Sequence, residues 1–243
     1  MVSPKNSEDD IEEPLINNSS STELTNSSNV SIPTPISSTN FNMSFIFSLL
    51  ASLGALLFAS TVWYITSSTE YIFFIWHPTL MATVLLMATQ GTIVLQKAES
   101  RQEKDGALNF HKLMQSITFL SVIGGFYIIY TFKSEENKEH FASPHGKSGL
   151  ITFSLILIQT IAGSTLVNFP GVVGGVAKAK SMYKYHRISG YLVLSLIWLT
   201  ALGGTGADWT KSQFDHPWVW LLATGMVLVG IIGGIKSNKM KIR

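Results

Sequence analysis

The chain has 243 residues, no cysteine and a net formal charge of +2. The absence of cysteine excludes disulfides, iron–sulfur clusters and haem attached through a C-x-x-C-H motif. So small a charge gives no reason to expect a nucleic-acid partner. No stretch has the pattern of a nucleotide site, and too little chain lies outside the apolar segments for a soluble flavin or nicotinamide domain.

The first 42 residues are polar and rich in Ser, Asn and Thr. They contain too few large apolar side chains to offset the entropy lost on ordering, so residues 1–42 are predicted to be a disordered tail. N-x-S/T sequons at Asn17, Asn18, Asn26, Asn29 and Asn42 could be glycosylated only outside the cytosol. Asn and Ser are so abundant here that sequons arise by chance.

Residues 43–236 are dominated by long apolar segments, with charge confined to the connections between them. Crossing a bilayer core of about 30 Å takes roughly 20 helical residues. Six segments are long enough: 44–66, 77–96, 111–132, 148–169, 186–206 and 217–235. Six such segments in succession favour an all-α membrane protein with six transmembrane helices over a soluble helical protein. Residues 237–243 are predicted to form a short basic tail.

The distribution of Lys and Arg indicates the orientation. Six spans place both termini and the connections 2–3 and 4–5 on one side, which carries 13 Lys and Arg residues against 4 on the other. Because cytosolic segments are enriched in these residues, both termini are expected in the cytosol. The pattern describes a multi-pass protein but does not distinguish an endomembrane from the plasma membrane.

Four of the six histidines stand at the starts of successive spans: His77, His111, His145 and His186. The alternating direction of the spans puts His77 and His145 near the non-cytosolic face and the other two near the cytosolic face. Spans 2–5 are therefore expected to form a central four-helix bundle that buries a cofactor between facing helices. At a helix start, the helix dipole favours the neutral imidazole that a metal needs.

Glycines recur on the histidine face of each span, because 4, 14 and 18 residues all return near the same side of an α-helix. These glycines are Gly149 and Gly190 at four residues, Gly91 and Gly125 at fourteen, and Gly163 and Gly204 at eighteen. Small residues on this face are expected where a flat porphyrin inserts. Close helix packing in membranes selects small residues too, and that interpretation stays open.

Two imidazoles per leaflet, without thiolate or acidic partners, suit haem iron with two axial histidines. Such an iron has no open position and transfers electrons, whereas structural zinc requires four ligands. Two other interpretations stay open. One is a haem-free transporter in which the histidines relay protons or substrate. The other is a membrane anchor subunit that passes electrons only to a partner protein.

Four short motifs resemble the cytochrome b561 family: W-H-P-T-L-M at 76–81, F-H-K-L-M-Q at 110–115, H-F-A-S-P-H-G-K-S-G at 140–149 and Y-K-Y-H-R-I-S-G-Y at 183–191. The resemblance covers roughly residues 44–236. It implies a six-helix reductase with two haem b groups, one held by His77 and His145 and one by His111 and His186. It also implies cytosolic ascorbate as donor, and monodehydroascorbate or a ferric chelate as acceptor.

The resemblance further suggests substrate contacts on the cytosolic side. Lys180 and Lys184 lie in the stretch where family members hold the ascorbate anion. The family often has a basic residue just before the ligand that matches His111, where this chain has Asn109 and Phe110, so Lys112 and Lys104 are the nearest candidates. The positive-inside rule would place lysines here regardless of substrate.

On the opposite side, His140 and Phe141 match a position that can line the acceptor site. His216, at the start of the sixth span, is expected to have an interfacial structural role. No side chain is expected to act as a chemical catalyst, and a homodimer is compatible with the sequence.

Overall fold

The computed structural model describes residues 43–236, and no residue in this range forms a β-strand. The predicted disordered tail at 1–42 and the predicted basic tail at 237–243 lie outside the described residues. The described chain consists of α1 (Met43–Ser68), α2 (Trp76–Lys97), α3 (Arg101–Glu135), α4 (Pro144–Asn168), α5 (Val176–Gly204), α6 (Asp208–Gln213) and α7 (Pro217–Gly233), with the short 3₁₀ turns η1 (Phe73–Ile75) and η2 (Pro170–Val173).

Five of the six expected spans, corresponding to α1–α5, are long and apolar enough to cross a membrane. The sixth expected span is the apolar helix α7, which has 17 residues. A helix of that length measures about 25 Å and falls short of a 30 Å core. The all-helical class is thus confirmed, while a sixth crossing remains a prediction.

Two helices begin earlier than hydropathy predicted. α3 begins ten residues before His111, and α5 begins ten residues before His186. The extensions are polar and charged, so hydropathy assigns them to the aqueous side although they continue the same helices. The α3 extension starts at a capping box, in which Ser100 and Glu103 satisfy each other's backbone N–H groups.

These longer helices correct one expectation about the histidines. His77 and His145 are the second residues of α2 and α4, where the helix dipole acts on them. His111 and His186 lie about three turns inside α3 and α5. The dipole effect falls off within the first turn, so the argument that it favours neutral imidazole is wrong for these two residues.

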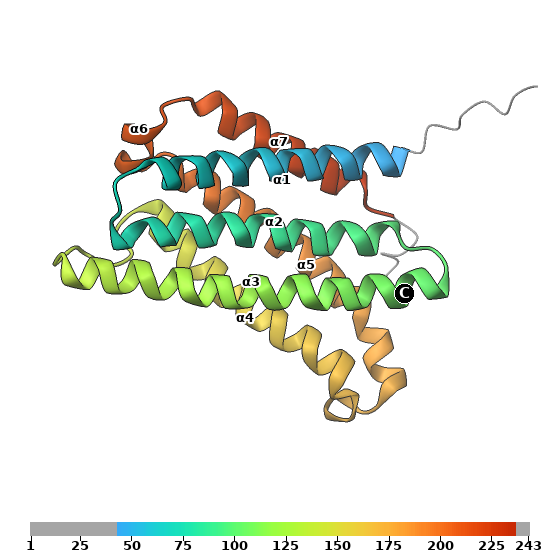
Figure 1. Ribbon diagram of the computed structural model, residues 1–243. Coiled ribbons are helices and arrows are strands. Elements are labelled where there is room, and N and C mark those ends of the chain that lie inside the picture. The colour runs from blue at the N-terminus through green and yellow to red at the C-terminus, as the bar shows by residue number, and fades with distance from the viewer. Residues whose placement is uncertain (1–42, 237–243) are drawn as a thin grey trace, which may run out of the picture. The chain divides into compact units, whose positions relative to one another are not determined.

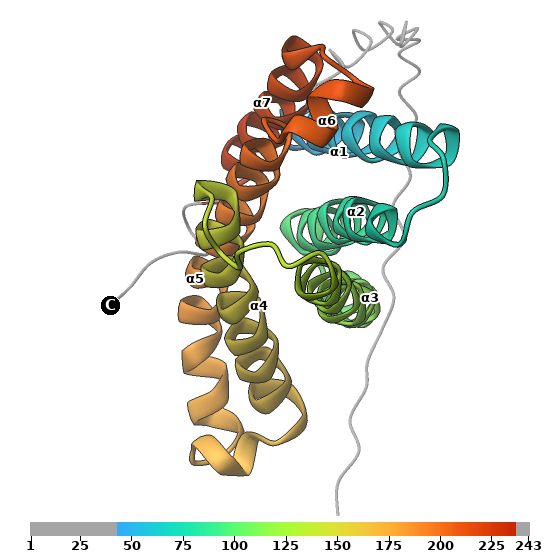
Figure 2. The same cartoon turned by 90° about the vertical axis from the view of Figure 1, so that its left-hand side faces the viewer.

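The helices are arranged as neighbouring pairs. α1 lies along α7, α2 along α3, and α4 along α5 (Figure 1). Direct contacts between the α2–α3 pair and the α4–α5 pair are sparse, and Figure 2 shows the two pairs as separate groups of helices. In Figure 1, α4 and α5 also run obliquely across the direction of α2 and α3.

A tryptophan at the centre of the core joins the two pairs. Trp198 of α5 is fully buried and donates its indole N–H to the hydroxyl of Thr89 on α2 at 3.0 Å. Its ring also packs edge-on against Phe58 of α1, with ring centroids 5.4 Å apart. This contact ties α1, α2 and α5 together where few other contacts link the pairs.

Small residues let α1 and α7 approach closely, as is common between membrane helices. A Cβ on Gly54 would lie 2.6 Å from the carbonyl oxygen of Ala223, and one on Gly230 would lie 2.5 Å from that of Phe47. The α1–α7 pair therefore forms a tightly packed support beside α2 and α5.

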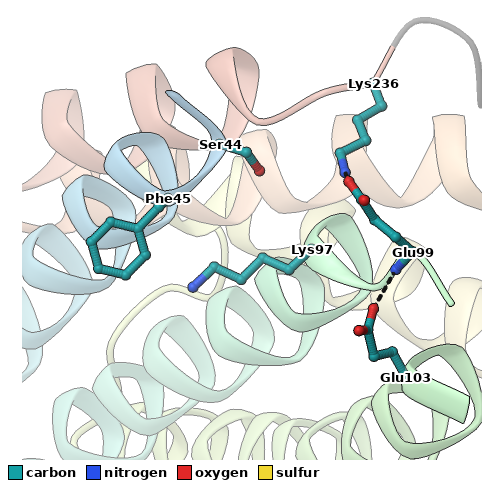
Figure 3. A pocket seen from close by; sticks show the side chains of 6 residues that line it. All are labelled: Ser44, Phe45, Lys97, Glu99, Glu103 and Lys236. Carbon is teal, nitrogen blue, oxygen red and sulfur yellow. Dashed lines mark hydrogen bonds and ion pairs between the residues drawn. The ribbon is translucent and has the colours of Figure 1, made fainter. Parts of the chain in front are cut away.

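A polar cluster closes the end of the bundle where α2 and α7 finish (Figure 3). Lys236 forms an ion pair with Glu99 at 2.6 Å, and Glu103 accepts a hydrogen bond from the backbone N–H of Glu99 at 2.8 Å. Lys97 lies over the ring of Phe45 at 5.3 Å. Glu99 is mostly exposed, so the ion pair contributes at most about 1 kcal/mol and is best explained as a structural tie.

Candidate functional site

His77 and His145 face each other at one end of the helix bundle. Their ring centroids are 6.5 Å apart and their planes differ by 78°. A ring nitrogen binds a first-row metal at about 2 Å, so two imidazoles on one metal have centres roughly 6 Å apart. The separation of these two rings therefore fits one shared metal ion.

The hydrogen bonds of both rings expose the correct nitrogen to such a metal. Nδ1 of His77 lies 2.9 Å from the carbonyl oxygen of Gly125, and Nδ1 of His145 lies 2.9 Å from that of Thr200. Because a carbonyl oxygen only accepts, Nδ1 carries the proton in each ring and Nε2 keeps its lone pair. Metal-binding histidines are characteristically held in this way.

His111 and His186, the second predicted pair, lie toward the other end of the bundle, against the far parts of α2 and α4. Nδ1 of His111 donates to the carbonyl oxygen of Gly91 at 2.9 Å, the pattern seen at the first pair. Nδ1 of His186 instead lies 3.1 Å from the side-chain amide nitrogen of Gln159. The structure thus brings His77 and His145 together, while the pairing of His111 with His186 stays a prediction.

The glycines at fourteen and eighteen residues lie against the histidines of the neighbouring helix. A Cβ on Gly163 would stand 2.7 Å from Cε1 of His186, and one on Gly204 would stand 2.8 Å from Cε1 of His145. In an antiparallel pair, a residue near the start of one helix meets the far part of its partner. Gly163 and Gly204 therefore make room for the imidazole rings themselves, whereas a Cβ on Gly125 or Gly91 would first meet Met81 or Met114.

The other two glycines have different surroundings. A Cβ on Gly149 would meet nothing within 4 Å and would project into open space beside His145. A Cβ on Gly190 would lie 3.0 Å from the amide nitrogen of Gln159. Of the six, Gly149 is the one whose position best matches the predicted gap for a flat cofactor.

The contacts between histidines and glycines of neighbouring helices also give the distance between the two histidine sites along the helices. Gly91, which bonds His111, follows His77 by fourteen residues, and fourteen residues of α-helix measure about 21 Å. The corresponding interval in α4, from His145 to Gly163, is eighteen residues or about 27 Å. The oblique course of α4 in Figure 1 accounts for this longer interval.

A largely apolar cavity of about 410 Å³ surrounds His77 and His145. Phe126 and Phe153 stack along it with ring centroids 4.2 Å apart. Its further lining includes Phe74, Met81, Tyr130, Lys133, Thr200, Gly204, Trp209 and Thr210. Burial among such side chains is what a low-polarity cofactor requires, with few polar groups to orient it.

His140 and Phe141 line this same cavity, as the acceptor-site hypothesis requires. His140 stacks on Tyr130 at 4.3 Å, and its Nε2 lies 3.1 Å from the hydroxyl of Ser134. Phe141 has a left-handed backbone with φ of 55°, which is uncommon for an aromatic residue and places a sharp turn at the cavity edge.

Lys133 is a cavity residue that the sequence analysis missed. It lies near the end of α3, lines the cavity and donates to the carbonyl oxygen of Glu139 at 2.8 Å. Its spacing from Tyr130 and Phe126 could have indicated that Lys133 shares their helix face, since positions three and seven residues apart lie on the same face. It gives this cavity a positive charge.

The three predicted cytosolic lysines do not share the faces of the nearby histidines. At 100° per residue, Lys184 and Lys180 project about 160° and 120° away from His186 around α5, and Lys112 about 100° away from His111 around α3. Lys184 lies instead over the ring of Tyr185 at 5.0 Å. Lys104, seven residues before His111, is only about 20° away from it.

A paired glycine substitution tests whether Gly204 makes room for His145. Gly204→Ala is expected to destabilise the protein by about 1–3 kcal/mol, because its Cβ would overlap the ring. Gly203→Ala is the control, since a Cβ there meets nothing within 4 Å and alanine favours the helix by up to about 1 kcal/mol. Thermal melting in detergent measures both, and equal melting temperatures would contradict the contact.

Comparison with known proteins agrees with this geometry. A family model described as eukaryotic cytochrome b561 matches residues 76–212, more than half of the chain, and this stretch contains all four paired histidines. The transmembrane reductase CYB561D2 of Bos taurus is 26% identical over 154 residues, which are 62% of this chain and 68% of the relative. The resemblance found in the motifs is confirmed, and the chain belongs to the cytochrome b561 family.

Proposed function

We propose that this protein is a six-span transmembrane reductase that holds two haem b groups and carries electrons from cytosolic ascorbate to an acceptor on the other side. His77 and His145 would hold one haem, and His111 and His186 the other. The observation that carries the proposal is the first pair: two rings 6.5 Å apart, each with Nδ1–H bonded to a carbonyl oxygen and Nε2 free.

The residues present fit this cofactor. Haem ligated by two imidazoles supplies one-electron redox chemistry and leaves no position for dioxygen. The chain contributes the ring orientation, through the carbonyl groups of Gly125 and Thr200, and the surrounding apolar cavity. Such burial and hydrogen bonding are the means by which a protein adjusts the potential of a haem.

The separation of the two histidine pairs supports transfer across the membrane. About 21 Å of α2 lies between their levels, which is most of a bilayer core of about 30 Å. With the cytosol at negative potential, outward movement of one electron is favoured by about 2.3 kcal/mol per 100 mV. The Lys and Arg distribution supports a cytosolic position for the His111–His186 pair.

Lysines near the starts of the apolar parts of α3 and α5 support an anionic donor on the cytosolic side. Lys180, Lys184 and Lys112 are proposed to attract the ascorbate anion toward the ends of α3 and α5. Lys104 has the better placement for direct contact, because it lies two turns from His111 on the same helix face.

On the non-cytosolic side, His140, Phe141 and Lys133 are proposed to receive the acceptor. The positive charge of Lys133 suits an anion, which describes both monodehydroascorbate and a ferric chelate of an organic acid. The Bos taurus relative is itself called a transmembrane reductase, which agrees with this role.

Single histidine substitutions test the assignment of ligands. His77→Ala and His145→Ala are each expected to remove one component of the dithionite-reduced visible spectrum. His111→Ala and His186→Ala should each remove the other component and abolish reduction by ascorbate from the cytosolic side. His216→Ala is the control and should leave both. Survival of both components in all four variants would refute the assignment.

Substitution of Lys133 tests the acceptor site. In proteoliposomes loaded with ascorbate, Lys133→Gln is expected to raise the KM for external ferric citrate by roughly threefold to tenfold, because a partly exposed charge pair is worth about 1 kcal/mol. Lys138→Gln is the control, since Lys138 is exposed and pairs with Glu136 at 3.8 Å. An unchanged KM in Lys133→Gln, or an equal rise in both variants, would count against the site.

A further inference from the structure

The four paired histidines differ in how their second ring nitrogen is held. Nδ1 of His77, His111 and His145 each donates to a backbone carbonyl oxygen of a neighbouring helix at 2.9 Å. Nδ1 of His186 has the side-chain amide of Gln159 at 3.1 Å instead. Any residue at the facing position would supply a backbone carbonyl oxygen. A side-chain amide, in contrast, is available only if that position is Gln or Asn.

The orientation of the Gln159 amide is determined by two other partners. Its nitrogen donates to the backbone carbonyl oxygen of His186 at 2.7 Å, and that oxygen can only accept. Its oxygen accepts from the hydroxyl of Ser189 at 2.8 Å. The amide therefore presents an N–H group to Nδ1 of His186, and Nδ1 is the acceptor.

This polarity is the reverse of that at the other three rings. A neutral imidazole whose Nδ1 accepts carries its proton on Nε2. The amide of Gln159 thus favours the opposite tautomer of His186 from the one that the carbonyl oxygens favour in His77, His111 and His145. Hydrogen bonding at the second nitrogen also alters how strongly the ring donates to a metal. The two histidine pairs are thus electronically different.

Space for this amide is built into both helices. Gly190 lies opposite Gln159, and a Cβ there would stand 3.0 Å from the amide nitrogen. Gly163, four residues after Gln159, makes room for the ring of His186 itself. The Gln159 amide therefore bridges α4 and α5 beside the ring of His186. The amide and the backbone at Gly163 both restrict movement of that ring.

We propose that Gln159 is the positioning residue of His186: it fixes the orientation of the ring and the polarity of the hydrogen bond at Nδ1, and so makes the haem held by His111 and His186 distinct from the haem held by His77 and His145. The inference rests on the proposed haem function. It adds a specific residue that differentiates the two sites.

Redox titration and low-temperature EPR of the purified, haem-loaded protein test the proposal. In Gln159→Leu, we expect one of the two haems to change its midpoint potential and its low-spin g-values, or to be lost, while the other keeps both properties. Ser189→Ala leaves the amide in place but removes the partner of its oxygen, along with hydroxyl contacts to the carbonyl oxygens of Tyr185 and His186. It should therefore cause a smaller change in the same haem, and it covers the case in which Gln159→Leu does not fold.

Gln96→Leu is the matched control, because Gln96 is a buried glutamine that bonds the carbonyl oxygen of Ile231 at 3.1 Å. It should leave both midpoint potentials unchanged. Unaltered potentials and g-values in Gln159→Leu and Ser189→Ala, or equal shifts of both haems, would overturn the role of Gln159 and leave the proposed function standing. A wild-type protein without haem would overturn both.

Discussion

The hydrogen bond from an imidazole Nδ1–H to a carbonyl oxygen on the neighbouring helix is the interaction on which the site depends. It selects one tautomer, holds the ring plane and leaves the lone pair of Nε2 available on His77 and His145, whose ring centroids are 6.5 Å apart. A free histidine near a membrane surface would rotate and would exchange its proton between both nitrogens. The bond is worth only about 1 kcal/mol, but at His145 it acts on a ring that Gly204 already confines.

Antiparallel pairing of the helices places these hydrogen bonds at two different depths, one for each histidine site. When two long helices run in opposite directions, the histidine near the start of each meets a residue far along the other. α2 and α3 repeat this relation with intervals of fourteen residues, and α4 and α5 with intervals of eighteen. The two helix pairs contact each other sparsely, so α1, α7 and the Trp198–Thr89 bond hold them in place. This leaves space between the pairs around His77 and His145.

Sequence patterns predicted those features that depend on hydropathy and helix period. They include the all-helical class, five of the six expected apolar spans, the proximity of His77 and His145, and the glycines that share the phase of the histidines. The extra ten residues at the starts of α3 and α5 were missed because hydropathy detects the edge of the apolar segment, and helices continue beyond it. The faces of Lys180 and Lys184 could have been derived from their offsets to His186, once the helix was known to include them.

Other features depend on how one helix is rotated against another. Gln159 stands in an apolar span, and no periodicity indicates that its amide reaches Nδ1 of His186 on α5. The role of Lys133 likewise depends on the turn at Phe141, which folds the connection back toward the end of α3. Such contacts require the three-dimensional arrangement.

The haem content of the purified protein tests the central claim most directly. Pyridine haemochrome absorbance, divided by the protein concentration from amino-acid analysis, should give two b-type haems per polypeptide. EPR of the oxidised protein should show both as low-spin iron, as two imidazole ligands require. A colourless preparation, or one that holds a single haem per chain after saturation with haem, would contradict the account.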